Sequence, residues 1–251
     1  LGDVYKRQGY SIEDLELILH PMAEDAKEAT GSMGDDTPLA VLSDKYRPLY
    51  HYFRQNFSQV TNPPIDSLRE NKVMSLKTRF GNLGNILDFS KLTKDNIYVL
   101  NSPILSNAQF EKFLKFFGNN NKVLDCTFSK DDDLETSINL LKVKSEQAVR
   151  EGIKQIILSD KNISENRMPM PMLLCIGAIN THLVKLGLRG YVSINVQTGD
   201  ALDTHSFATL IGVGATTVNP YLAFDSLYQR HSKKLFGNFT FDECVSRYIK
   251  S

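Results

Sequence analysis

Apolar residues in the first third of the chain recur every three or four positions, the spacing of a helix that buries one face. The first stripe follows the capping-box pattern Ser11-Ile-Glu-Asp14 and consists of Ile12, Leu15, Ile18 and Leu19. Pro21 limits this helix, although a kinked helix would continue to about Glu28. Two later stripes are Leu49, Tyr52, Phe53, Phe57 and Val60, and then Ile65, Leu68, Val73, Leu76 and Phe80. We therefore expect residues 9–95 to be a segment of helices joined by specialised loops.

From residue 96 onward, short apolar runs alternate with helical stretches. The runs predict buried strands over 97–100, 123–127, 155–159, 192–196 and 217–219. Helices are expected over 108–117, 134–151, 170–186 and 205–212. Strands begin roughly 25–36 residues apart, the size of a strand–helix unit, which implies a parallel sheet with right-handed crossovers. Five such units fall short of the eight in a closed barrel. The predicted fold class is therefore α/β, with an incomplete (β/α) barrel-like parallel sheet over 96–251.

The overall charge excludes two classes of partner. The chain has 251 residues, of which 29 are basic and 29 acidic, so its formal net charge is zero. No basic field exists to attract nucleic acid, and no apolar run approaches the roughly 18 residues needed to span a membrane. The three cysteines are Cys126, Cys175 and Cys244, which are far apart and outside any CxxC spacing. This spacing predicts neither a disulfide framework nor a zinc site and favours a reducing, cytoplasmic location.

Residues 1–8, LGDVYKRQ, do not resemble a natural start, because they lack a Met. DVYKRQ is an in-frame reading of GATGTGTATAAGAGACAG, a string similar to the transposon end used in sequencing libraries. We expect this segment to be a sequencing-adapter scar that does not belong to the natural fold. On this interpretation the natural protein continues upstream.

Two loops in the helical segment have unusual composition. The stretch 31–50, GSMGDDTPLAVLSDKYRPLY, matches neither a Walker A loop nor a dinucleotide-binding G-x-G-x-x-G. Its neighbouring acids, Asp35 and Asp36, would suit a divalent cation, or they cap turn amides in the simpler interpretation. The stretch 59–66, QVTNPPID, places Thr61 and Asn62 before a stiff Pro63-Pro64 pair. It is either a rigid polar turn or an ordinary helix connector.

Two later stretches follow or precede predicted strands and carry candidate chemistry. In 198–205, TGDALDTH, the side chains of Asp200, Asp203 and His205 could form a metal or acid–base cluster. The simpler interpretation is that Asp203 or Thr204 caps the next helix. In 212–220, GVGATTVNP, backbone amides could hold a phosphate, or the stretch is a tight turn between helix and strand.

Several segments of the sequence resemble a known protein family and so indicate more than residue spacing does. GYSIEDLELILHPMAEDAKEATGSMGDDTPLAVLS, YFRQNFSQVTNPPIDSLRE, LSDK and IGVGATTVNPYLA resemble, in order, the central region of the glutamate synthase large subunit. The resemblance runs from about Gly9 to Ile249. It implies a rudimentary version of a flavin barrel, lying between an amidotransferase domain that releases ammonia from glutamine and an FMN domain with an iron–sulfur cluster. In that family the ammonia adds to 2-oxoglutarate and the imine is reduced to glutamate.

The resemblance also implies which parts are absent from this chain. We expect neither the catalytic Cys of the amidotransferase nor the cysteine cluster and flavin site, so no catalytic, cofactor-binding or metal-binding residue is assigned. The resemblance places the GSMGDD loop and the VTNPP turn near the ammonia path. That role passes to five residues: Met33, Gly34, Asp35, Thr61 and Asn62. The expected partners are the two missing domains and a small electron-transfer subunit or ferredoxin.

Two other hypotheses stay open from the sequence. One is a free-standing FMN- or phosphate-binding barrel enzyme, motivated by the stretches 212–220 and 198–205. The other is an interaction module without a tunnel, which would use 9–95 as a docking surface. The electron donor, NADPH, NADH or ferredoxin, is not encoded in any motif of this chain.

Overall fold

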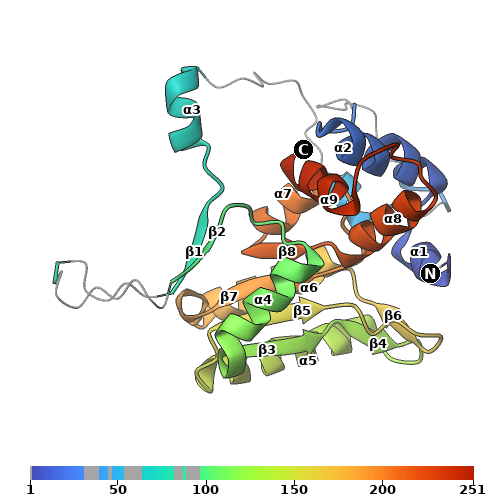
Figure 1. Ribbon diagram of the computed structural model, residues 1–251. Coiled ribbons are helices and arrows are strands. Elements are labelled where there is room, and N and C mark those ends of the chain that lie inside the picture. Colours follow the sequence, from blue (N-terminus) through green and yellow to red (C-terminus); the bar gives the residue numbers. More distant parts are fainter. Residues whose placement is uncertain (1, 31–39, 45–46, 54–63, 82–86, 89–96) are drawn as a thin grey trace. The chain divides into compact units, whose positions relative to one another are not determined.

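The chain forms two compact units in the computed structural model (Figure 1). One unit consists of residues 1–58 and 104–251, and the other of residues 59–103. The structure describes residues 2–30, 40–44, 47–53, 64–81, 87–88 and 97–251. No helix in these ranges has the length and apolar character that crossing a membrane requires.

A four-stranded parallel sheet is the centre of the larger unit (Figure 1). Its strands, in spatial order, are β3 (Asn121–Asp125), β5 (Gln155–Ser159), β7 (Ser193–Gln197) and β8 (Thr217–Asn219). This order follows the chain, as it does in a βα barrel, whereas a doubly wound sheet reverses its strand order at a switch point. The described strands do not close, so the predicted incomplete barrel-like sheet is confirmed.

Three crossover helices connect successive strands of this sheet. They are α5 (Leu134–Arg150), α6 (Met172–Lys185) and α7 (Thr204–Gly212). Their buried apolar side chains share one core with Ile156, Leu158 and Val196, which all point to the same face of the sheet. Burial of this face is the main driving force for the fold.

Helix boundaries in this unit follow local capping chemistry. α4 (Asn107–Phe117) and α9 (Phe241–Lys250) each begin with a capping box, and Asp133 caps α5 by accepting the Thr136 N–H. α8 (Tyr221–Ser232) follows β8 directly. Neither α8 nor α9 was predicted from the sequence, and both contribute to the core through residues such as Phe224 and Tyr248.

The N-terminal helical segment begins with the predicted capping box but ends earlier than predicted. Ser11 and Asp14 exchange hydrogen bonds between side chain and backbone, as the capping-box pattern predicts. A π-helix, η1 (Asp14–Leu19), then leads into α2 (His20–Asp25), with Pro21 in its first turn. The wider π turn accommodates the proline, which has no N–H to donate. α2 ends before Glu28, because Ala26 takes a left-handed conformation with φ 54°. Preceding it, α1 (Gly2–Gln8) is formed by the residues predicted to be a scar.

Short elements complete the larger unit. Among the described residues of this unit, three short segments are 3-10 helices: η2 (Leu49–Phe53), η4 (Gly118–Asn120) and η5 (Arg189–Tyr191). β4 (Thr127–Ser129) and β6 (Arg167–Pro169) form an antiparallel pair beyond the carboxyl ends of β3 and β5.

The smaller unit corrects two predictions. It contains α3 (Ser67–Val73) and an antiparallel pair of β1 (Thr78–Phe80) with β2 (Tyr98–Leu100). The third predicted helix therefore ends at Val73, and Phe80 lies in a strand, because a short apolar run fits either period until its partner decides. The predicted strand over 97–100 exists but lies outside the parallel sheet. Instead, Ile104 forms an isolated parallel bridge with Val218 at the β8 edge.

Candidate functional site: the carboxyl edge of the sheet

Buried polar side chains gather where β5, β7 and β8 end. Asp160 follows β5, Thr198 and Asp200 follow β7, and Tyr221 begins the helix after β8. The carboxyl ends of parallel strands meet at one edge, where barrel-type and open α/β proteins bind their ligands. Asp160 and Thr198 are fully buried here. This edge is therefore the candidate site.

One hydroxyl group bridges two carboxylates at this edge. Thr198 Oγ1 lies 2.6 Å from Asp160 Oδ2 and 2.8 Å from Asp200 Oδ1. A threonine hydroxyl carries a single hydrogen, so it donates to one carboxylate at a time. The second contact is satisfied when one carboxyl group holds a proton of its own.

Asp160 is held by the backbone of the turn after β7. The Gly199 N–H lies 3.1 Å from each carboxylate oxygen, and Gln8 Nε2 donates to Oδ2 at 3.2 Å. A Cβ at position 199 would lie 2.8 Å from Gln8 Nε2 and 2.9 Å from the Tyr221 hydroxyl, so a larger residue there would displace the ends of these two side chains. Burial, and then the charge of Asp200, raise the pKa of Asp160 to about 7.

Asp200 connects three segments of the chain. Oδ1 accepts the Tyr50 hydroxyl at 2.7 Å, and Oδ2 accepts the Met172 N–H at 3.1 Å. Met172 is the first residue of α6, whose N-cap position is occupied by Pro171 and has no side-chain cap, so Asp200 supplies the cap from a distance. Burial raises the pKa of Asp200, against the lowering effect of the hydrogen bonds it accepts. Burial and the Asp200 charge raise the pKa of Tyr50.

The acid–base cluster considered for 198–205 does not form. Asp203 caps α7 by accepting the Ser206 N–H at 2.9 Å, as the simpler interpretation predicts. His205 Nε2 lies 2.9 Å from the carbonyl oxygen of Tyr50, and because a carbonyl only accepts, Nε2 carries a hydrogen. Among the described residues, no group of three or more His, Cys, Asp and Glu side chains is placed to hold a metal ion.

The sheet face opposite the crossover helices carries two rows of polar contacts, one fully and one partly buried. In one row, Ser159 donates to Gln197, which donates to Asn219, with bonds of 2.8 and 3.2 Å. In the other row, Thr217 donates to Asn195, which donates to Gln155, with bonds of 2.7 and 2.9 Å. These rows were not predicted from the sequence. The alternation of apolar residues with Asn195 and Gln197 in β7 was the available signal.

The glycine-rich stretch 212–220 is a tight turn between α7 and β8. The amides of Val213, Gly214, Ala215 and Thr216 all donate to backbone carbonyls of the chain. Gly214 has φ 126°, and a Cβ there would lie 2.6 Å from Asn180 Cγ. Arg189 fastens the turn by donating to Asn180 Oδ1 and to the Gly214 carbonyl at 2.7 and 2.9 Å. These amides are occupied, so the geometry opposes a phosphate loop.

The five residues assigned to the ammonia path lie outside the described residues. They are Met33, Gly34, Asp35, Thr61 and Asn62. Asp36 lies outside them as well, so the cation and turn-capping interpretations of that loop both stay predictions.

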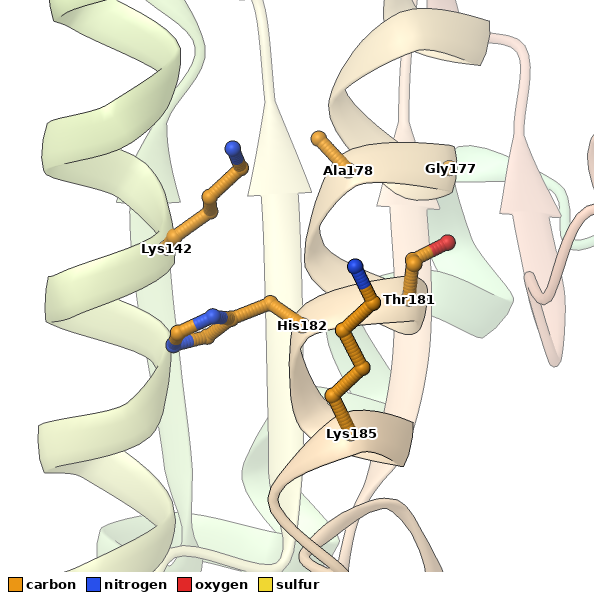
Figure 2. A pocket seen from close by; sticks show the side chains of 6 residues that line it. All are labelled: Lys142, Gly177, Ala178, Thr181, His182 and Lys185. Atoms are coloured by element: carbon orange, nitrogen blue, oxygen red, sulfur yellow. The ribbon is translucent and has the colours of Figure 1, made fainter.

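Two surface pockets flank α5 and are separate from the buried cluster. The first, with a volume of about 250 Å³, lies between α5 and α6. Figure 2 shows Lys142 and His182 reaching across the groove between these helices, with Lys185 along its side. His182 Nε2 hydrogen-bonds Glu146 at 3.0 Å, so an acid balances part of the basic lining. The second, also about 250 Å³, lies beside the β4–β6 pair, where Arg167 binds Asp125.

The fold defines the class of this protein: it is a barrel-like α/β domain. The carboxyl edge of its sheet, where such folds bind ligands, is occupied by the chain's own side chains. The chain belongs to the glutamate synthase central domain family, whose model matches residues 3–251.

The curated relatives of this chain are glutamate synthases. The chain is 51% identical over 246 residues to the glutamate synthase [NADPH] large chain of Azospirillum brasilense, covering 97% of this chain and 16% of the relative. It is 41% identical over 255 residues to the corresponding Bacillus subtilis large chain, covering 100% and 16%. The spinach (Spinacia oleracea) chloroplastic ferredoxin-dependent glutamate synthase is 41% identical over 233 residues, covering 88% and 14%. The chain thus spans about one sixth of the length of these relatives.

Proposed function

We propose that this chain is the central scaffold of a glutamate synthase and forms part of the wall of its ammonia path. The whole enzyme would convert glutamine and 2-oxoglutarate to two molecules of glutamate, using a reduced electron donor. The observation that carries the proposal is the filled carboxyl edge of the sheet in a chain of this family. Where a barrel enzyme would bind substrate, Asp160 is buried, Asp200 is partly buried, and both are bonded to the chain's own groups. An edge occupied in this way suits a scaffold better than a catalytic centre.

Exposed apolar side chains support a role between domains. In the segment 40–53, Val41 is 80% exposed and Leu42 is 95% exposed, and Tyr52 and Phe53 are about half exposed. Apolar side chains clustered at a surface are typical of contact regions. We propose that the amidotransferase and FMN domains of the same large chain cover this segment. The same observation favours the second candidate, a docking module without a tunnel.

The cofactors of the proposed enzyme do not fit the residues described here. The described residues hold no metal-binding group, and the amides of the 212–216 turn are already paired. We therefore assign FMN and the iron–sulfur cluster to other parts of the enzyme. The names of the relatives include both NADPH and ferredoxin-dependent forms, so either ferredoxin or an NADPH-linked small subunit would supply electrons. A cytoplasmic location belongs to the same proposal and rests on three unpaired, buried cysteines.

The ammonia path itself is assigned to Met33, Gly34, Asp35, Thr61 and Asn62. Compact polar groups on a stiff backbone would guide a small neutral amine without binding it tightly and would keep water out. The ammonia-path role and the docking role can be tested separately, because a docking module needs no such lining.

The test uses a complete large chain that contains this segment. Thr61→Val and Asn62→Leu should release free ammonia during glutamine turnover, while synthesis from added ammonium continues. Thr181→Val, an exposed change on α6, is the matched control and should behave like the parent. If glutamine-driven synthesis stays intact and no ammonia escapes, the path assignment is wrong and the docking role stands.

A further inference from the structure

Tyr50 is fixed at two points by one segment of the sheet edge. Its hydroxyl donates to Asp200 Oδ1 at 2.7 Å, and its carbonyl oxygen accepts from His205 Nε2 at 2.9 Å. The side chain of Tyr50 is buried, with 4% of its surface exposed. Two bonds to opposite ends of one residue determine both the position and the direction of the backbone at η2.

The two anchors are themselves held in place. Asp200 lies in the turn after β7 and accepts further hydrogen bonds from Thr198 Oγ1 and the Met172 N–H. His205 is the second residue of α7, just after its Asp203 cap. Side chains locked by packing and by secondary hydrogen bonds hold a partner more closely than side chains on a free loop. The anchors therefore transmit the geometry of the sheet edge to η2.

We propose that Asp200 and His205 are positioning residues for ammonia transfer, which act by holding Tyr50 and η2 against the sheet edge. The proposal rests on the proposed function. Thr61 follows Phe53, the last residue of η2, by eight positions in the chain. In the chain, η2 is the last described element before Thr61 and Asn62 of the assigned path. A small misplacement at such a point is enough to lower the efficiency of transfer.

The test measures ammonia escape from a complete large chain carrying the variants Tyr50→Phe and His205→Ala. Each removes one of the two bonds to residue 50. We expect free ammonia released per glutamine consumed to rise roughly threefold or more, with ammonium-driven synthesis unchanged. His205→Gln restores an N–H donor at a similar reach and should lower the escape again. Tyr248→Phe is the matched control, because the Tyr248 hydroxyl is buried and donates to Leu202 O at 2.6 Å on the same segment.

The outcomes separate this proposal from the function on which it rests. If Thr61→Val releases free ammonia but neither Tyr50→Phe nor His205→Ala does, the positioning role is wrong and the proposed path stands. No escape in any of the variants overturns the path as well. Equal loss of glutamine-driven and ammonium-driven synthesis in both Tyr50→Phe and His205→Ala shows a general structural role and also overturns the proposal.

Discussion

The Tyr50 hydroxyl and the Asp200 carboxylate meet at 2.7 Å across 150 positions of the chain. This bond joins the N-terminal helical segment to the turn after β7. The same carboxylate also accepts the first N–H of α6. A single side chain thus connects the helical segment, the sheet edge and a crossover helix, and Asp200 is the residue whose removal should disturb most neighbours.

Replacing Asp200 with Ala should lower the free energy of unfolding by about 3 kcal/mol, because buried donors at Tyr50 and Met172 lose their acceptor. Asp200→Asn keeps an acceptor oxygen and should cost about 1 kcal/mol. Asp131→Ala changes an exposed acid and should stay within about 0.5 kcal/mol of the parent. Urea unfolding followed by far-ultraviolet circular dichroism measures all three, since the chain has no Trp. Equal losses for the Ala and Asn variants would contradict the proposed role of the acceptor.

The stability of the chain should depend on the protonation of Asp160. Its folded-state pKa is about 7, above the ordinary value of 3.8, so the folded chain retains a proton that the unfolded chain loses between these values. The contribution of Asp160 to the free energy of unfolding is therefore fully present below pH 4 and declines as the pH rises toward 7. Asp160→Asn should flatten this part of the pH profile. Unfolding is measured at several pH values for both proteins. If the free energy of unfolding changes with pH to the same extent in the parent and in Asp160→Asn, the assignment is wrong.

Gly214 and Gly212 offer a matched pair two positions apart. Gly214→Ala should lower the free energy of unfolding by about 2 kcal/mol, because the residue has φ 126° and its Cβ would meet Asn180 Cγ at 2.6 Å. Gly212→Ala meets nothing within 4 Å at the end of α7 and should be neutral or stabilising by about 0.5 kcal/mol. Thermal unfolding of both variants measures the difference. If Gly212→Ala is destabilised as much as Gly214→Ala, the turn tolerates no added side chain at either position, and the explanation by φ and the Asn180 contact is wrong.

Local pattern was sufficient for most of the larger unit. The strand bounds predicted at 155–159 and 217–219 match β5 and β8, and the predicted helix at 134–151 matches α5 within one residue. These elements have strong periodicity and clear caps such as Asp133, so local preference and packing agree. The helix predicted through Phe80 failed because its spacing matched a helix by chance, and pairing of β1 with β2 decided the conformation.

The amino-acid sequence by itself determined the family, the alternation of strands and helices, and the capping roles of Asp14 and Asp203, because these depend on residues close together in the chain. Only the tertiary structure decided what Asp200 and His205 do. Their partner, Tyr50, is about 150 positions away, and nothing in the local pattern distinguishes a residue that anchors a distant turn from one that binds a metal. The reason is physical: the charge, burial and partners of a carboxylate are set by strands that meet only after the sheet has formed.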